Sequence, residues 1–423
     1  MSAPRPTRVV VIGIGIVGAI TALELLRDGH RVTMLDPGEP GGRQAASYGN
    51  GAWLSPASVV PMSLPGLWRK LPGFLLDREG PLTIRWSALP QLLPWLIRFL
   101  SAGATLAKVE ATARALSTLL RECPDRHAGI AAEIGRPDLI RRAGLLYAYP
   151  DRAAFDAEAL AWRLRRDNGV SWTELGADDL RRLEPALDRR YGFGALIGAG
   201  GHCVDPGAYV AAIAAHCEAR GAAFRRTAAQ GFAIAAGRLR AVRTADGEIA
   251  CDRAVICAGI HAKRLAAQAG DRIPLESERG YHAVIANPAV SLSIPIMPSD
   301  GKMANTTTAA GLRIAGQVEL AGTGTAPDWN RADILVRHAM RTYPALAEAG
   351  PPTVDRWIGH RPSTPDGLPV IGPASAAPDI VHAFGHGHIG LAAAAATGRI
   401  VADLLGDKPP EAPVSPFAPS RFA

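Results

Sequence analysis

The chain of 423 residues lacks paired cysteines, uninterrupted apolar runs and clusters of basic residues. Its five cysteines form no Cys-x-x-Cys pair, which argues against a disulfide framework or a cysteine zinc site and indicates a reducing compartment. The most apolar stretch, residues 82–100, contains Arg85, Pro90, Pro94 and Arg98. A membrane-spanning helix needs ~20 apolar residues without such interruptions, so no span is predicted.

The same stretch leaves two interpretations open, because Trp86 and Trp95 lie among leucines and isoleucines. The favoured one is a packed helix pair broken by proline, and the alternative is an interfacial patch that touches a membrane. No secretory signal is predicted, since Arg5 and Arg8 precede only a short apolar segment without a cleavage site. We therefore expect a cytoplasmic protein, with peripheral contact on the inner face of a membrane as the alternative.

The net charge of +7 comes from scattered arginines rather than from a basic run. No RNA- or DNA-binding motif accompanies it, so we expect anionic small molecules or an anionic membrane surface, and not nucleic acid, as partners. The length allows two domains with large cores. The sequence does not indicate an oligomeric state.

Three glycines near the start of the chain, Gly13, Gly15 and Gly18, follow an apolar run and precede an amphipathic one. Asp36 closes a second apolar segment, and this spacing is typical of a dinucleotide-binding strand–helix–strand unit. Gly13 permits the tight turn, Gly15 lets the backbone approach a pyrophosphate, and Gly18 lets the helix pack closely. Asp36 would accept hydrogen bonds from ribose hydroxyls and repel a 2′-phosphate, but it does not distinguish FAD from NAD.

A second glycine loop, residues 385–390, lies between a predicted strand at 380–384 and an alanine-rich helix at 391–405. A second helix N-terminus suits the negative charge of a reduced isoalloxazine ring, which favours FAD over NAD. His386 and His388 in this loop have the spacing of a chelating pair. No acid or cysteine with ligand spacing lies nearby, so no metal is predicted.

Arg361 stands before Pro362 at a predicted strand end, a position that suits two-pronged binding of a carboxylate. The alternative is a structural arginine that pairs with Asp366 or with a backbone carbonyl. Elsewhere the patterns predict helices over 89–133, 154–167, 206–220 with Asp205 as N-cap, and 331–343, and strands over 223–226, 237–243, 253–259 and much of 280–316.

Together with Ser47–Gly51, Val204–Pro206, Ala258–Gly259 and Arg279–Tyr281, these segments resemble the flavin-dependent D-amino acid oxidase superfamily, and within it the bacterial D-amino acid dehydrogenases. The resemblance implies an α/β fold, α+β overall, with a discontinuous Rossmann-like FAD-binding domain and an antiparallel-sheet substrate domain. We place the first domain at 1–78, 204–270 and 355–410, the second at 79–203 and 271–354, and an extended tail at 411–423.

The resemblance also implies residue roles. Arg361 would bind the substrate carboxylate with Tyr281 as hydroxyl partner, and the His388 backbone N–H would face the flavin. His282, His360 and Thr306 are further substrate-site candidates. The predicted cofactor contacts are Gly13, Ile14, Gly15, Ile16, Val17, Gly18, Asp36, Pro37, Ser47, Asn50, Gly51, Ala229, Ala258, Gly259, Arg361, Gly385, Gly387, His388, Ile389 and Gly390.

The implied reaction is FAD-dependent oxidative deamination of a D-amino acid, with quinone or oxygen as electron acceptor. Non-covalent FAD is expected, because no cysteine follows Cys257. Secondary-amine acids such as D-hydroxyproline or sarcosine stay open as substrates. Two further alternatives are a 2-hydroxy acid dehydrogenase, with His282 or His360 as base, and a flavin-binding subunit without turnover.

Overall fold

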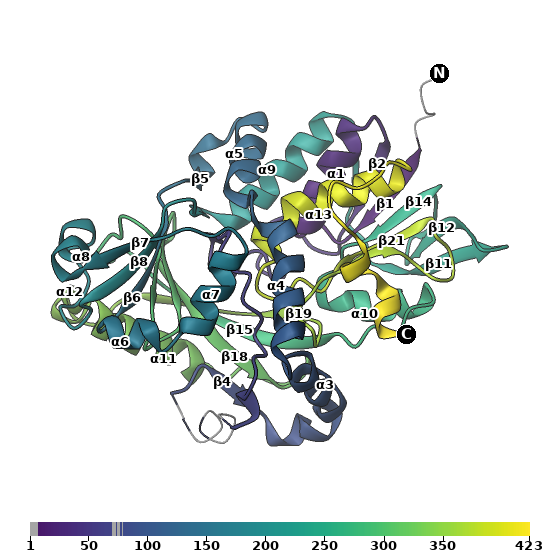
Figure 1. The fold of residues 1–423 in the computed structure, drawn as a ribbon. Helices are drawn as coiled ribbons and strands as arrows, with labels where there is room; N and C mark the ends of the chain where they lie inside the picture. The colour runs from purple at the N-terminus through teal and green to yellow at the C-terminus, as the bar shows by residue number, and fades with distance from the viewer. Residues whose placement is uncertain (1–6, 70–72, 74–76, 78) are drawn as a thin grey trace.

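Two large sheets organise the computed structural model, which describes residues 7–69, 73, 77 and 79–423 (Figure 1). The first has six strands in the order β10-β2-β1-β14-β21-β20, parallel except for β20. Its strands come from distant parts of the chain: β1 (Arg8–Ile12), β2 (Arg31–Leu35), β10 (Ala223–Arg225), β14 (Arg253–Ile256), β20 (Val370–Pro373) and β21 (Ile380–Phe384).

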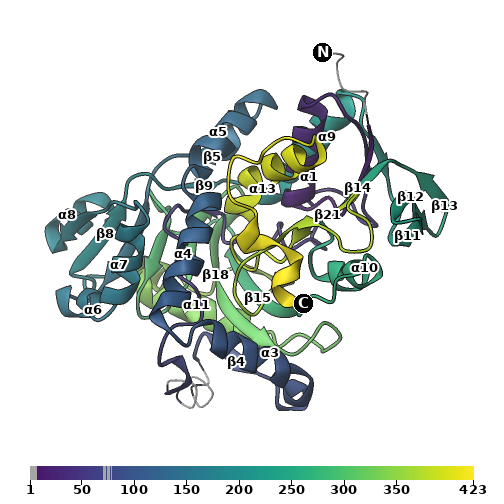
Figure 2. The ribbon, with the colours of Figure 1, turned by 45° about the vertical axis from the view of Figure 1, so that its right-hand side comes forward.

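Both faces of this sheet are covered, which explains the uninterrupted apolar run of β1. Val9 and Val11 pack on helices α1 (Ile16–Arg27), α9 (Pro206–Ala219) and α13 (Gly390–Leu405). Val10 and Ile12 face the other side, toward α10 (Ala262–Gln268) and the small sheet of β11 (Ala229–Ala235), β12 (Arg238–Thr244) and β13 (Gly247–Ala250). Figure 2 shows these two layers on either side of β14 and β21.

The second sheet has nine strands in the order β19-β15-β18-β17-β16-β6-β8-β7, with β4 also paired to β18. It is antiparallel except for the β16–β6 and β18–β4 pairs. Helix α11 (Asn330–Thr342) packs on one face. The strands are β4 (Leu82–Ile84), β6 (Leu145–Tyr149), β7 (Thr173–Gly176), β8 (Phe193–Ile197), β15 (Glu276–Ile285), β16 (Ile296–Pro298), β17 (Ala304–Thr308), β18 (Gly311–Leu320) and β19 (Val354–Ser363).

Shorter elements complete the described chain. A three-stranded sheet is formed by β3 (Trp53–Leu54), β9 (Gly201–Cys203) and β5 (Ile140–Arg141). The other helices are α3 (Leu89–Ala102), α4 (Leu106–Leu120), α5 (Cys123–Glu133), α6 (Arg152–Asp156), α7 (Ala159–Asp167), α8 (Ala177–Leu183) and α12 (Pro344–Glu348). In the part of the chain described, no single helix is long and apolar enough to span a membrane. The helical segments 86–102 and 106–133 have the required length and apolarity only when they are counted together, and the chain bends by 93° between them.

The predicted fold class is confirmed, as are the helix at 206–219 with its Asp205 cap, the helix at 330–342 and the strand at 380–384. The helix expected over 154–167 is interrupted, and α6 and α7 take its place. Residues 82–100 do not form two helices: they form β4, a 3-10 turn at Trp86–Ala88 and α3, which keeps Pro94 inside.

The segment 411–423 is not extended, contrary to the prediction. Two 3-10 turns, Ser415–Phe417 and Pro419–Phe422, fold it back onto the first sheet, since Phe417 is fully buried in the core beside α13. Arg421 is fixed there by an ion pair of 2.7 Å with Asp366. The proposed domain boundaries stay a prediction. They assign nearly all of β19 to the FAD-binding domain, but β19 pairs with β15, which they assign to the substrate domain.

Candidate active site

A cavity of about 2160 Å³ is lined by residues of both large sheets. Its walls include the loop after β1, the loop before α13, the Ser47–Gly51 loop and strands β15, β17, β18 and β19. The carboxyl ends of β1 and β21 point into it, which is where open α/β sheets bind ligands.

The loop after β1 has the geometry that its glycines predict. Gly13 has φ +91°, and a Cβ there would lie 2.7 Å from the Cys257 carbonyl oxygen, so no other residue fits. The first N–H of α1, from Ile16, donates to Ser47 Oγ at 2.9 Å. The N-terminus of α1 therefore faces the cavity next to a hydroxyl group, which is a ready site for a pyrophosphate.

Asp36 fixes this loop and also lines the cavity. Its carboxylate accepts hydrogen bonds from Ile14 N at 2.8 Å and from Gly38 N at 2.9 Å. Burial raises the pKa of Asp36 more than these hydrogen bonds lower it. A partly buried carboxylate with free acceptor positions suits ribose hydroxyl groups.

The Ser47–Gly51 loop is held rigidly against the inner face of the nine-stranded sheet. Thr306 Oγ1 donates to Gly51 O at 3.0 Å, and buried Arg313 donates to Tyr48 O at 3.0 Å and Asn50 O at 2.9 Å. A Cβ on Gly51 would lie 3.2 Å from that of Ala304. Thr306 therefore positions this loop and does not line the cavity.

Arg361 on β19 lines the cavity without a strong partner. Its guanidinium covers Gly280, where a Cβ would come within 2.6 Å of Cζ, and it donates a hydrogen bond to Gln317 O at 3.4 Å. No carboxylate of the described residues lies within ion-pair distance, and Asp366 pairs with Arg421 instead. Of the structural alternative considered above, the pairing with Asp366 is wrong, whereas the bond to a backbone carbonyl is present, as the long contact with Gln317 O. Burial lowers the pKa of Arg361, and the charge of Glu278 opposes this effect.

The structure does not bring Tyr281 to the cavity. Strand neighbours point to opposite faces, and Tyr281 points toward α11. Its hydroxyl donates to Glu319 Oε2 at 2.6 Å and accepts from Asp328 N at 2.9 Å. The hydroxyl group is thus fully used within the core.

The two histidines beside Tyr281 and Arg361 differ in position. His282 does not line the cavity: its Nδ1–H donates to Gly49 O at 3.2 Å, its ring stacks on Trp357, and burial lowers its pKa to about 3. His360 does line the cavity, with Nδ1 2.8 Å from Ser277 Oγ, and burial lowers its pKa too. Although His360 lines the cavity, it is the strand neighbour of Arg361, so its side chain leaves the sheet on the face opposite to that of Arg361.

The two histidines of the second glycine loop differ in exposure: His386 is buried, whereas His388 is exposed and lines the cavity. His386 Nε2 lies 3.0 Å from Thr397 Oγ1, and burial lowers the pKa of His386 to about 3. Among the residues described, no three His, Cys, Asp or Glu side chains are grouped to hold a metal. Gly385 and Gly387, with φ of +84° and +51°, bring this loop to the start of α13.

Most of the predicted cofactor residues meet at the cavity, and only Ile14 and Gly18 lie behind it, in the turn and the helix packing. The lining members are Gly13, Gly15, Ile16, Val17, Asp36, Pro37, Ser47, Asn50, Gly51, Ala229, Ala258, Gly259, Arg361, Gly385, Gly387, His388, Ile389 and Gly390.

Sequence reasoning missed Glu278, which lines the cavity opposite Arg361. No motif contains it. The available signal was alternation, because Glu276, Glu278 and Gly280 share one face of β15, whose start lies before the strand-rich region predicted over 280–316.

A family model described as FAD dependent oxidoreductase, DAO, matches residues 8–404. The chain is 53% identical to the D-amino-acid oxidase of Bradyrhizobium diazoefficiens over 99% of this chain and 100% of that protein. It is 31% identical to D-amino acid dehydrogenase 2 of Ralstonia nicotianae, over 98% and 100% of the two chains. Among solved structures, glycine oxidase from Geobacillus kaustophilus has a TM-score of 0.74 at 21% identity, covering 99% of this chain and 100% of the other. That likeness shows a shared fold.

Proposed function

Because the chain belongs to the DAO family of FAD-dependent oxidoreductases, we propose that it oxidises D-amino acids at Cα, giving an imino acid that water hydrolyses to a 2-oxo acid and ammonia. The observation that carries the proposal is Arg361, a cation in the cavity wall with no carboxylate partner among the described residues. An amino acid carboxylate would supply that partner.

The cavity fits FAD. The N-termini of α1 and α13 suit the phosphates and the ring, and Asp36 suits a ribose. When bound, FAD supplies the acceptor for the hydride that leaves Cα. Non-covalent binding is supported by Cys257, the cysteine in the cavity wall, because burial raises the pKa of its thiol to about 12 and keeps it unreactive. Flavin that stays with the chain after acid precipitation would contradict non-covalent binding.

The side chains of the site act by positioning. Arg361 would hold the carboxylate through charge-assisted hydrogen bonds. Ala304, Ala315 and Val318 contribute apolar surface to the lining of the same cavity. Correct orientation alone supplies ~7–11 kcal/mol of barrier reduction. A hydroxy acid would need a base for its hydroxyl proton. His282 does not reach the cavity, and His360 lines it but leaves the sheet on the face opposite to that of Arg361, so the geometry favours an amino acid.

For the electron acceptor we propose oxygen, because the relative at 53% identity is named an oxidase whereas those near 31% are named dehydrogenases. Peroxide release in air, measured beside the reduction of a dye, separates the two. Peroxide at a rate matching 2-oxo acid formation would support an oxidase, and dye reduction without peroxide would contradict it.

A second candidate is a dehydrogenase that reduces a lipid-soluble quinone. The observation that favours it is the apolar cavity rim at α3, where Trp86, Leu93 and Ile97 are 72%, 51% and 59% exposed. Peripheral contact of this rim with the inner face of a membrane, and a cytoplasmic location, are part of this proposal. Co-sedimentation with vesicles that Trp86→Ala abolishes would support it.

The substrate class is tested with paired D- and L-amino acids, sarcosine and D-hydroxyproline, each scored by flavin reduction without oxygen. The proposal expects D-amino acids to reduce the flavin and their L-enantiomers not to. Reduction by sarcosine or D-hydroxyproline alone would assign the secondary-amine alternative.

A further inference from the structure

We propose that Glu278 binds the substrate ammonium group and so makes the site select amino acids over hydroxy acids and simple carboxylates. This inference rests on the proposed function. Glu278 and Arg361 stand directly opposite each other on the paired strands β15 and β19. Both line the cavity.

The two side chains share one face of the sheet at a useful separation. Directly opposite residues of antiparallel strands have Cβ atoms about 5 Å apart. No nitrogen of Arg361 reaches a carboxylate oxygen of Glu278 within ion-pair distance, because the guanidinium extends over Gly280. The site therefore presents one positive and one negative group side by side, as an amino acid zwitterion requires.

Among the described residues, the cation whose charge acts on the Glu278 carboxyl group is Arg361. Its cross-strand neighbour on β18 is Leu320, and Val318 lies next to it on the cavity face. Burial raises the pKa of Glu278, and Arg361 and Ser363 only partly oppose this. A half-buried carboxylate without a close partner is costly, and a bound ammonium would remove that cost.

Glu319, on the neighbouring strand β18, shows what a structural carboxylate looks like in the same sheet. It is fully buried and contacts Arg85, Arg279 and the Tyr281 hydroxyl. All of these partners come from the protein. Glu278 has a smaller set, the charge of Arg361 and a hydrogen bond from Ser363, and this contrast favours a ligand as its further partner.

The test is Glu278→Gln in the FAD-loaded enzyme, compared with Glu276→Gln. Glu276 lies on the same face two residues away, opposite Ser363 instead of Arg361. Flavin absorbance per chain confirms that each variant is folded and loaded. The apparent Kd of a D-amino acid is taken from the concentration dependence of the rate of flavin reduction without oxygen. The Kd of benzoate, a carboxylate with no ammonium, is measured by flavin difference spectra.

For Glu278→Gln we expect Kd and KM for the D-amino acid to rise about tenfold to a hundredfold, the equivalent of one charge-assisted hydrogen bond. Benzoate should bind more tightly, because the negative charge beside its carboxylate is gone. Glu276→Gln should change both constants much less, and Glu278→Asp should restore part of the amino acid affinity.

The directions in which the Kd values for the D-amino acid and for benzoate change decide whether Glu278 binds the ammonium group. Equal weakening of amino acid and benzoate would make Glu278 structural, and unchanged amino acid binding would also overturn the inference. If the wild-type enzyme itself neither binds nor oxidises D-amino acids, the proposed function fails instead, so the two failures are distinguishable.

Discussion

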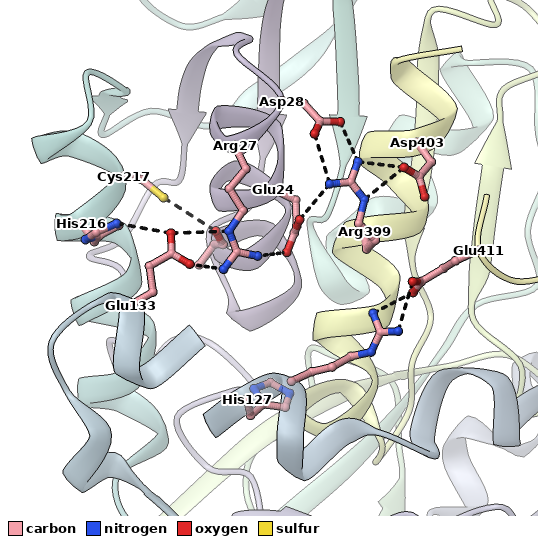
Figure 3. Close-up of polar contacts among 12 residues, drawn as sticks. Glu24, Arg27, Asp28, His127, Glu133, His216, Cys217, Arg399, Asp403 and Glu411 are labelled. Carbon is pink, nitrogen blue, oxygen red and sulfur yellow. Dashed lines mark hydrogen bonds and ion pairs between the residues drawn. The ribbon is translucent and has the colours of Figure 1, made fainter. Parts of the chain in front are cut away.

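Two groups of charges in this molecule differ in how completely they are paired. The first, which we term the helix network, joins α1, α5, α9 and α13 behind the first sheet (Figure 3). Arg399 lies between Asp28 at 2.6 Å and Asp403 at 2.8 Å and also contacts Glu24 at 3.0 Å. Arg27 joins Glu24 to Glu133. The second is the pair Arg361 and Glu278 in the cavity, which face each other across two strands and make no ion-pair contact among the described residues.

In a chain rich in arginine, a charged side chain without an ion-pair contact indicates a functional site better than a paired one does. In the helix network each cation is neutralised by the fold, so its expected role is stability. In the cavity the fold brings two charges to one surface and leaves them open. Leaving partly buried charges unpaired is unfavourable unless a ligand completes the pairing.

The largest expected effect comes from a change that destroys the cofactor site and leaves both groups of charges in place. Gly15→Val should abolish FAD retention, because a β-branched side chain would occupy the space beside Ser47 where the pyrophosphate must approach. Flavin absorbance of the purified protein measures it. Gly129→Ala is the matched control, since Gly129 lies in α5 with open space around its Cβ position and should keep full flavin. Full flavin in Gly15→Val would contradict the assignment of this loop.

Removing the open cation should have the next largest effect. Arg361→Lys keeps the charge but loses the planar two-pronged geometry, so kcat/KM for a D-amino acid should fall about tenfold to a hundredfold. The loss should appear in KM more than in kcat, and Arg361→Ala should lose more. Steady-state kinetics check this, with flavin content as the control. A normal KM in Arg361→Ala would contradict the binding of the substrate carboxylate by Arg361.

Removing a paired cation should change stability and leave substrate binding intact. Arg399→Ala would leave Asp403 without its cation and would remove one of two cations from Glu24 and from Asp28. Breaking such a partly buried network costs about 3 kcal/mol of unfolding free energy. Arg8→Ala breaks the exposed pair with Asp252 and should cost less than about 1 kcal/mol. Denaturant unfolding of the FAD-loaded proteins gives both values. If Arg399→Ala raised KM instead, the division between the two groups of charges would fail.

The smallest expected effect is the pH dependence of the unfolding free energy that Arg399→Ala removes. Burial alone would raise the pKa of Asp28, but hydrogen bonds from Arg399 and Lys408 hold it below its ordinary 3.8. A depressed carboxyl pKa contributes stability above the unfolded pKa, and this contribution is lost as the pH falls through the folded value. The difference in unfolding free energy between wild type and Arg399→Ala should therefore be full at neutral pH and shrink below about pH 4. A difference that stays constant down to pH 2.5 would contradict this.

The sequence predicted those parts of the fold and site that depend on local backbone requirements. The two glycine loops and Asp36 could be recognised because each needs a particular residue at a particular turn. Arg361 stood out because a cation at a strand end beside a proline is a poor surface position. These features meet at the cavity.

Pairing across strands could not be predicted in the same way. The face to which Tyr281 points depends on the register of β15 against β18 and β19, which includes a shift between Tyr281 and His282. Nothing in the sequence around Glu278 indicates that it lies opposite Arg361. Only the register of β15 against β19 places the two residues side by side. The fold-back of 411–423 depends on a pocket for Phe417 that distant segments build.

The most direct test of the account compares an amino acid with its amide in the wild-type enzyme and in Arg361→Ala. D-Alaninamide keeps the amine and the Cα–H but lacks the carboxylate, so the wild-type enzyme should oxidise it poorly. If Arg361 binds the substrate carboxylate, Arg361→Ala should lower kcat/KM for D-alanine by about a hundredfold or more, while kcat/KM for the amide should change little. Equal losses for the acid and the amide, at normal FAD content, would show that Arg361 is structural and would contradict the assignment of the open cation to the substrate.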